Sequence, residues 1–213
     1  HAARAIAAFE RTRWTALDSP YDRYLGGDMS AMSEAAKRGA VLFCDKAACA
    51  QCHSGPLLSD FQHHGLAVPQ VGPGKNAPGD DTGRFLETGN GADLYTFRTP
   101  QLRNVALTGP WMHSGAFTSL EAAVRHHLDP LASQANYDAS QLPALFASTH
   151  DTDAGREAAR AAALSPLLAS PTGLTDGEFA DLMAFLHALT DPASLNMLPQ
   201  IPDRVPSGLP VKD

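Results

Sequence analysis

Residues 49–53 are Cys49-Ala50-Gln51-Cys52-His53, a Cys-x-x-Cys-His motif. Two thiols three residues apart lie on one turn, where they can add to the two vinyl groups of a haem, and the adjacent histidine can reach the iron. The pattern predicts one covalently attached haem c, with His53 as the proximal iron ligand. Covalent haem of this type indicates redox work in a periplasmic or otherwise extracytoplasmic compartment.

Three other kinds of site use similar cysteine spacings. Cys44, Cys49 and Cys52 have the spacing of a plant-type iron–sulfur protein, but that cluster needs a fourth cysteine and the chain has three. A zinc site would need a second Cys or His pair at finger spacing, and a thioredoxin-like motif would need a βαβ setting. Haem attachment leaves Cys44 over. We expect it to be buried at a helix end, and a disulfide outside this chain is the alternative.

The composition is that of a globular protein, with 44% hydrophobic and 18% charged residues. No apolar stretch reaches about 18 residues, so no membrane span is predicted. The formal net charge of −7 argues against a nucleic-acid partner. The chain opens on a helix-like stretch without a secretory signal, so we expect a mature or truncated fragment.

Helical patterns recur along the chain, whereas residues 54–100 are rich in Gly, Pro, Asp and Asn. Helices are predicted over residues 1–14, 33–43, 118–128, 154–164 and 175–189. Thr118 and Thr175 each begin a capping-box pattern, Thr-x-x-Glu. No strand alternation stands out. We therefore predict a mainly α, cytochrome c-like haem domain with long irregular loops wrapping the haem.

This organisation gives three parts. Residues 1–30 are an N-terminal helix and linker packing on the haem domain, at the end of a missing N-terminal haem domain. Residues 31–191 are the haem domain, and residues 192–213 are an extended, proline-rich tail.

Several residues are candidates for the sixth iron ligand: Met112, His113, His126, His127, Met183, Met197 and the pair His63–His64. His127 follows Leu120, Ala123 and Val124 at i, i+3, i+4, i+7 spacing, which places it on the apolar face of its helix. His126 lies instead with Ala122 and Arg125. A buried iron would itself be a partner for His127. His127 is thus the first candidate and His113 the second, with a methionine or an open iron position as further alternatives.

Several stretches outside the haem motif carry specific residue patterns: residues 7–12, 19–25, 38–43, 59–61 with His64, 81–84, 97–115 and 120–124. The most specific is FRTPQLRNVALTGPWMHSG at residues 97–115. With these patterns the chain resembles, over most of its length, the C-terminal haem domain of the bacterial di-haem cytochrome c peroxidase and MauG family.

The resemblance implies that His53 is the proximal ligand of the higher-potential, six-coordinate haem. Typical peroxidases of the family place a methionine three residues after the valine of the Leu-Glu-x-x-Val helix, and MauG places a tyrosine there. This chain has His127. A haem with two histidine ligands should have a lower potential than one with histidine and methionine. The departure points to the MauG-like branch, whose members oxidise side chains on a partner protein; one relative, associated with methanobactin biosynthesis, oxidises a partner tryptophan.

The resemblance also implies calcium between two haem domains, bound by backbone carbonyls of a Thr-x-Pro step. Thr108 and Pro110 match that step, and a plain turn is the alternative. Arg84 and Arg103 are candidate partners for haem propionates, because a guanidinium fork suits a carboxylate. Surface salt bridges are the alternative for both.

The family's peroxidatic haem lies in an N-terminal domain with its own motif, and this chain has one motif. The second haem domain is expected upstream or on a separate chain, unless the protein lacks one. The leading hypothesis is an electron-transfer domain of a di-haem peroxidase or oxidase. Hydrogen peroxide would react at the partner haem, with a redox protein as donor or a protein as substrate. The alternatives are a stand-alone electron-transfer cytochrome and direct peroxidase activity at an open site on this haem.

Overall fold

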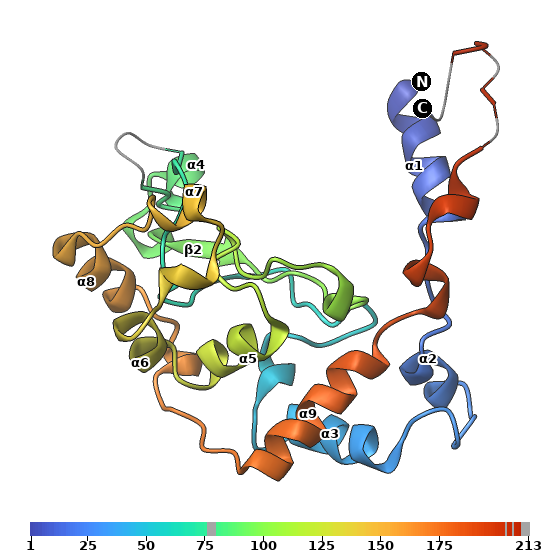
Figure 1. The fold of residues 1–213 in the computed structure, drawn as a ribbon, viewed down its shortest axis with the longest axis horizontal. Coiled ribbons are helices and arrows are strands. Elements are labelled where there is room, and N and C mark those ends of the chain that lie inside the picture. The colour runs from blue at the N-terminus through green and yellow to red at the C-terminus, as the bar shows by residue number, and fades with distance from the viewer. Residues whose placement is uncertain (76–79, 203, 206, 210–213) are drawn as a thin grey trace.

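The computed structural model describes residues 1–75, 80–202, 204–205 and 207–209, and the fold is mainly α as predicted (Figure 1). Its longer helices are α1 (Ala2–Arg13), α3 (Glu34–Cys44), α5 (Leu120–Leu128), α8 (Ala154–Ala162) and α9 (Asp176–Ala188). Its shorter helices are α2 (Pro20–Leu25), α4 (Phe85–Thr88), α6 (Pro130–Ala135) and α7 (Ala144–Ala147). The strands are β1 (His63–Gly65) and β2 (Thr96–Arg98). Short 3-10 turns cover Cys49–Gln51, Gly91–Asp93, Val105–Leu107, Ala139–Gln141, Pro166–Leu168, Pro192–Leu195 and Leu198–Gln200.

Helices α3 and α9 cross closely and form the main core. A Cβ atom at Gly39 would lie 1.9 Å from the carbonyl oxygen of Asp181, so only glycine permits this approach. Phe43 and Phe185 pack edge to face with ring centroids 5.1 Å apart. The predicted capping box of α9 is confirmed, because Thr175 and Glu178 each accept a hydrogen bond from the other's backbone N–H. This core holds the end of α3, from which the haem motif follows.

Helix α5 begins one residue later than the predicted capping box implies. Ser119 is its N-cap, since Ser119 Oγ accepts a hydrogen bond from Ala122 N at 3.1 Å. Thr118 N instead donates to Gln141 Oε1 at 3.2 Å. The prediction of a capping box at Thr118 is therefore wrong, because a tertiary contact engages Thr118. The helix ends at Leu128, as predicted.

The loop-rich region of residues 54–100 contains a short antiparallel strand pair that the sequence pattern did not predict. Strands β1 and β2 pair with His63 opposite Arg98 and Gly65 opposite Thr96. Strands of three residues are too short to show an alternating pattern. The predicted turn residues Pro78 and Gly79 lie outside the described residues.

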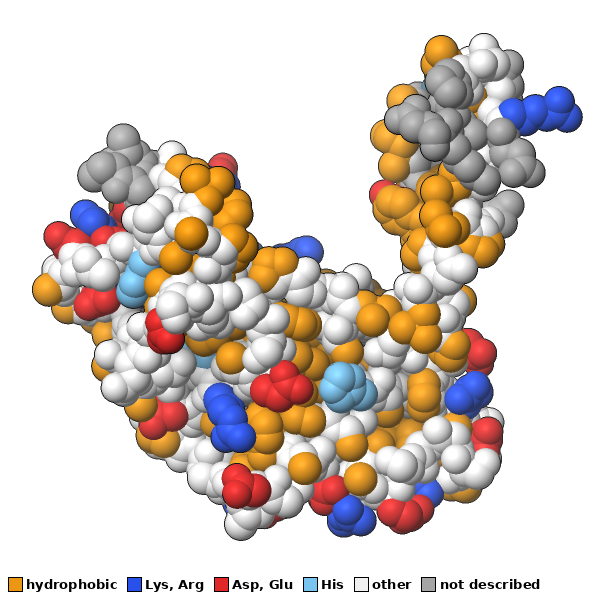
Figure 2. Space-filling view, in the orientation of Figure 1, with side chains coloured by type: hydrophobic (Ala, Val, Ile, Leu, Met, Phe, Trp, Pro, Cys, Tyr) orange, Lys and Arg blue, Asp and Glu red, His pale blue; other side chains and the backbone are white. Residues whose placement is uncertain are grey.

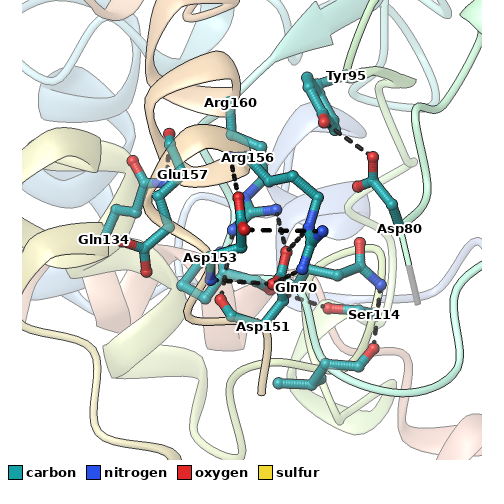
Figure 3. Close-up of polar contacts among 12 residues, drawn as sticks. Gln70, Asp80, Tyr95, Ser114, Gln134, Asp151, Asp153, Arg156, Glu157 and Arg160 are labelled. Carbon is teal, nitrogen blue, oxygen red and sulfur yellow. Dashed lines mark hydrogen bonds and ion pairs between the residues drawn. The ribbon is translucent and has the colours of Figure 1, made fainter. Parts of the chain in front are cut away.

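The segment of residues 65–70, here the 65–70 loop, is anchored through its carbonyl oxygens. The donors are Ser165 N to Gly65 O (2.8 Å), His126 Nε2 to Leu66 O (2.8 Å), Ser114 Oγ to Pro69 O (3.2 Å) and Asp151 N to Gln70 O (2.9 Å). Asp151 also binds Arg156 and the buried Arg160 (Figure 3). Bonds from separate segments of the chain therefore brace this loop against the body of the protein.

Two terminal segments leave the body in the same direction (Figure 1) and form what we call the arm, residues 1–17 and 192–202. A hydrogen bond of 2.8 Å from Asp18 N to Asp191 Oδ2 joins the two segments at their base. Figure 2 shows the arm standing apart from the body, with apolar side chains on its surface. Within the tail predicted as extended, Pro192–Leu195 and Leu198–Gln200 form short 3-10 turns. No helix in the described part of the chain is long and apolar enough to cross a membrane.

Candidate haem-binding site

The haem motif follows α3 on a tight turn. Ala48 adopts a left-handed conformation with φ of 54°, and Cys49–Gln51 form a 3-10 turn. His53 N donates to Cys49 O at 2.9 Å, which keeps the motif compact. Burial raises the pKa of the Cys49 thiol to about 12.

The three cysteines do not converge as an iron–sulfur site would require. Among the described residues, the one cluster of three His, Cys, Asp or Glu side chains close enough to share an ion is Cys52, Asp60 and His64. Cys44 is exposed, so the prediction that it is buried is wrong. Phe43 faces the core, and the next residue points about 100° away around the helix.

His53 and His127 face each other across the site. Their ring centroids lie 6.3 Å apart, with 62° between the ring planes. Two metal–nitrogen bonds of about 2 Å each, plus the distance from each ring centre to its nitrogen, fill such a separation. His53 Nδ1 donates to Leu58 O at 3.0 Å and His127 Nδ1 to Ala123 O at 2.8 Å. Each ring is thus oriented through Nδ1, which leaves Nε2 for a metal, so the pair fits a haem iron.

The surroundings of both rings favour the neutral imidazole that a metal needs. Burial, followed by the nearby His127 ring, lowers the pKa of His53 to about 4. Burial likewise lowers the pKa of His127. Neither ring would need to lose a proton before binding iron at neutral pH.

Other candidate ligands lie elsewhere in the structure. His113 Nε2 is 2.9 Å from Asp81 Oδ2, and the His113 ring stacks on Phe97 with centroids 3.8 Å apart. Met183 is buried in the α3–α9 core, and Met197 lies in the arm. Among the candidates in the described residues, His127 is the one whose ring faces His53.

His126 is a site-adjacent residue whose environment the sequence did not reveal. Helical periodicity placed it away from the apolar face, yet it is fully buried. Its ring packs against Phe117 and hydrogen-bonds Leu66 O and Ser133 Oγ. The expectation about its face is therefore wrong, because the 65–70 loop covers that side of α5. The one sequence feature that could have drawn attention to His126 is its position directly before His127.

The two candidate propionate partners are engaged by protein groups. Arg103 Nη1 binds both carboxylate oxygens of Asp22 at 2.8 Å, and its Nε donates to Pro56 O at 2.8 Å. Burial opposes ionisation of Asp22, but bonds from Ser19 and Arg103 outweigh it and lower the pKa of that carboxyl. Arg84 lies 2.7 Å from His63 Nδ1 and 3.5 Å from Asp93. The polar partners of both arginines are thus protein groups, and those of Arg103 engage its Nε and Nη1.

Thr108 and Pro110 lie on an exposed turn beside an apolar groove of about 720 Å³. Leu107, Trp111 and Phe146 are among the residues that line the groove. Calcium takes about 6 to 8 oxygen ligands, so two carbonyls on this turn would need further ligands from elsewhere.

Comparison with known proteins identifies the family. No family model matches the chain. The chain is 34% identical over 210 residues to the cytochrome-c peroxidase IdrP1 of Denitromonas iodatirespirans, covering 87% of this chain and 48% of that protein. It is 32% identical over 206 residues to the methylamine utilization protein MauG of Methylorubrum extorquens, covering 95% and 47%. The crystal structure of a MauG-like protein associated with microbial copper homeostasis matches with a TM-score of 0.65 and 31% identity, over 88% of this chain and 56% of that one.

The chain belongs to the di-haem cytochrome c peroxidase and MauG family. Membership in this family implies haem c as the cofactor. The chain spans about half the length of the curated relatives it matches, 48% of one and 47% of another.

Proposed function

We propose that this chain is the electron-transfer haem domain of a periplasmic di-haem peroxidase or oxidase. The observation that carries the proposal is the facing pair His53 and His127, whose ring centroids lie 6.3 Å apart. Haem c supplies reversible one-electron chemistry, and an iron with two imidazole ligands has no open position for hydrogen peroxide. This domain would relay electrons, and hydrogen peroxide would react at a second haem. The species oxidised is a cytochrome or a side chain on a partner protein.

Each residue of the motif has a role in this proposal. Cys49 and Cys52 would hold the haem by thioether bonds, and His53 and His127 would bind its iron. The Nδ1–H groups of both histidines donate to backbone carbonyls, which fixes the ring orientation and increases the basicity of Nε2. Arg103 orients one propionate through Nη2, and Arg84 at the β1 edge is a second candidate.

The identity of the distal ligand favours the MauG-like branch of the family. A second imidazole lowers the haem potential relative to a methionine ligand. A haem of lower potential loses electrons more readily and would better stabilise an oxidised enzyme awaiting a protein substrate. We therefore propose a protein side chain, rather than a small cytochrome alone, as the substrate class.

The second haem domain is proposed to cover the arm and the groove beside Thr108 and Pro110. Arm residues Leu195 and Leu198 are 68% and 69% exposed, which is unfavourable without a partner surface. The matched relatives are about twice the length of this chain, so they have the material for such a domain. Calcium would bind between the two domains, with the carbonyls of Thr108 and Pro110 supplying part of its oxygen ligands. Removal of calcium with a chelator should then slow turnover and leave the low-spin spectrum of this haem intact.

The test is the denatured mass and optical spectrum of the holoprotein expressed from the full gene. Two haems, one low-spin and one high-spin, with peroxide consumed at the high-spin haem, would support the proposal. A single low-spin haem that is inert to peroxide would contradict it and leave an electron carrier.

The His127→Ala variant tests the ligand assignment separately. It should convert the low-spin haem to a high-spin form, because it removes one axial ligand. The matched control is His113→Ala, which should leave the low-spin signal unchanged. An unchanged spectrum in His127→Ala would exclude His127 as the ligand.

A further inference from the structure

His126 lies next to the proposed ligand His127, and its ring is buried and hydrogen-bonded through both nitrogens. Its side chain is 0% exposed. Its Nε2 lies 2.8 Å from Leu66 O and its Nδ1 lies 3.0 Å from Ser133 Oγ. Its ring also packs against Phe117, with centroids 5.1 Å apart. Both ring nitrogens and one ring face of His126 therefore have partners.

The partners determine which nitrogen of His126 carries the proton. A carbonyl oxygen can only accept, so Nε2–H must donate to Leu66 O. Nδ1 of the neutral ring then accepts from the hydroxyl of Ser133. The two bonds come from opposite directions, since Leu66 lies in the 65–70 loop and Ser133 in α6. They fix the ring in one tautomer and one orientation.

The carbonyl that His126 contacts belongs to a braced segment. Gly65 O accepts from Ser165 N, Pro69 O from Ser114 Oγ, and Gln70 O from Asp151 N. Asp151 is itself bound by Arg156 and Arg160, as Figure 3 shows. The 65–70 loop therefore gives His126 a fixed point of attachment.

Attachment of His126 determines the direction of His127. Successive residues on an α-helix are about 100° apart, so fixing one of them fixes the rotation of α5 about its axis. The rings of His126 and His127 accordingly have different orientations, with centroids 6.4 Å apart and 86° between the ring planes. One residue before His126, the Arg125 guanidinium lies 3.9 Å from the centre of the Phe179 ring of α9. These contacts leave α5 little freedom to rotate.

We propose that His126 is a positioning residue for the haem: it locks α5 to the 65–70 loop and so directs His127 at the iron. This inference rests on the proposed ligation of haem by His53 and His127. A group that holds a metal ligand in place adds to metal affinity without touching the metal.

The experiment compares His126→Leu and His126→Gln with wild-type holoprotein. Leucine removes both hydrogen bonds, whereas the glutamine amide can still donate to Leu66 O. Electron paramagnetic resonance of the ferric haem is the readout, because its low-spin g-values follow the angle between the two imidazole planes. Cyanide affinity is a second readout, since cyanide must displace His127. The matched control is His187→Gln, an exposed histidine on α9.

His126→Leu should shift the low-spin g-values and increase cyanide affinity on the order of 10-fold, the lower end of what loss of such support costs a metal site. His126→Gln should recover most of the wild-type behaviour, and His187→Gln should match wild type. If His126→Leu does not fold, Ser133→Ala removes the Nδ1 bond alone and should give a smaller shift in the same direction.

The outcomes separate this inference from the proposed function. If His127→Ala makes the haem high-spin but His126→Leu has wild-type g-values and cyanide affinity, the positioning role is wrong and the ligation stands. If His127→Ala leaves the spectrum unchanged, both the ligation and the positioning role are wrong. If His126→Gln has the wild-type g-values and cyanide affinity but His126→Leu does not, the hydrogen bond to Leu66 O is responsible for positioning His127.

Discussion

Large apolar side chains form a buried core in the body of this protein and are exposed in the arm. In the body, Leu182 on α9 is fully buried against α3. In the arm, Ile6 and Trp14 are 59% and 58% exposed, although α1 has the same helical pattern as the body helices. The body therefore buries the large apolar side chains of its core, whereas the arm exposes several such side chains.

The largest effect is expected in the body core. Leu182→Ala should lower the free energy of unfolding by about 2–5 kcal/mol, because it leaves a cavity between α9 and α3. Denaturant unfolding of the holoprotein measures this loss. The control is Leu195→Ala in the arm, which should change stability by less than about 0.5 kcal/mol. Equal effects at the two leucines would mean that the arm is part of the core.

Acid should destabilise the body next most strongly. Burial, followed by the neighbouring His127 ring, lowers the pKa of His126 to about 4 from its ordinary 6.5, while the hydrogen bond to Leu66 opposes the shift. Between these pH values the unfolded chain binds more protons than the folded one, so stability is complete above pH 6.5 and falls as the pH drops toward 4. The loss from His126 is about 3 kcal/mol.

Unfolding free energies measured across this pH range test the assignment to His126. The His126→Gln variant should lose this part of the pH dependence, and His187→Gln should keep it. A pH profile of His126→Gln identical to wild type would assign the acid sensitivity to other groups.

A smaller effect is expected at the start of α9. Thr175→Ala removes the hydroxyl that accepts from Glu178 N and should cost about 1 kcal/mol of stability. Thermal unfolding of the holoprotein measures the change. Thr175→Ser keeps the hydroxyl and serves as the control, with stability close to wild type. A loss as large in Thr175→Ser would point to the methyl group instead of the cap.

The smallest effect on the body is expected from a charge in the arm. Leu198→Asp should change the unfolding free energy of the haem-motif body by less than about 0.5 kcal/mol, since the side chain is 69% exposed. Unfolding monitored by the absorbance of this haem measures it. A loss above about 1 kcal/mol would show that the arm supports the body directly.

Much of the site could be predicted from local sequence because its chemistry is local. Cys49, Cys52 and His53 lie on one turn, so their spacing alone indicates haem attachment. The helix that carries His127 followed from periodicity, and the structure places that ring opposite His53. The capping box at Thr175 was visible for the same reason, since its partners are three residues apart.

Contacts between distant segments decided the rest. Thr118 N bonds Gln141 instead of forming the predicted cap, and His126 is covered by the 65–70 loop, Phe117 and Ser133. Arg103 binds Asp22, which is 81 residues away in the sequence. The haem motif, the helical class and the ligand candidates could be predicted because they depend on neighbours within a turn or two. Which candidate faces His53, and what holds it there, could not be predicted, because burial and hydrogen-bond partners depend on segments that are distant in the sequence.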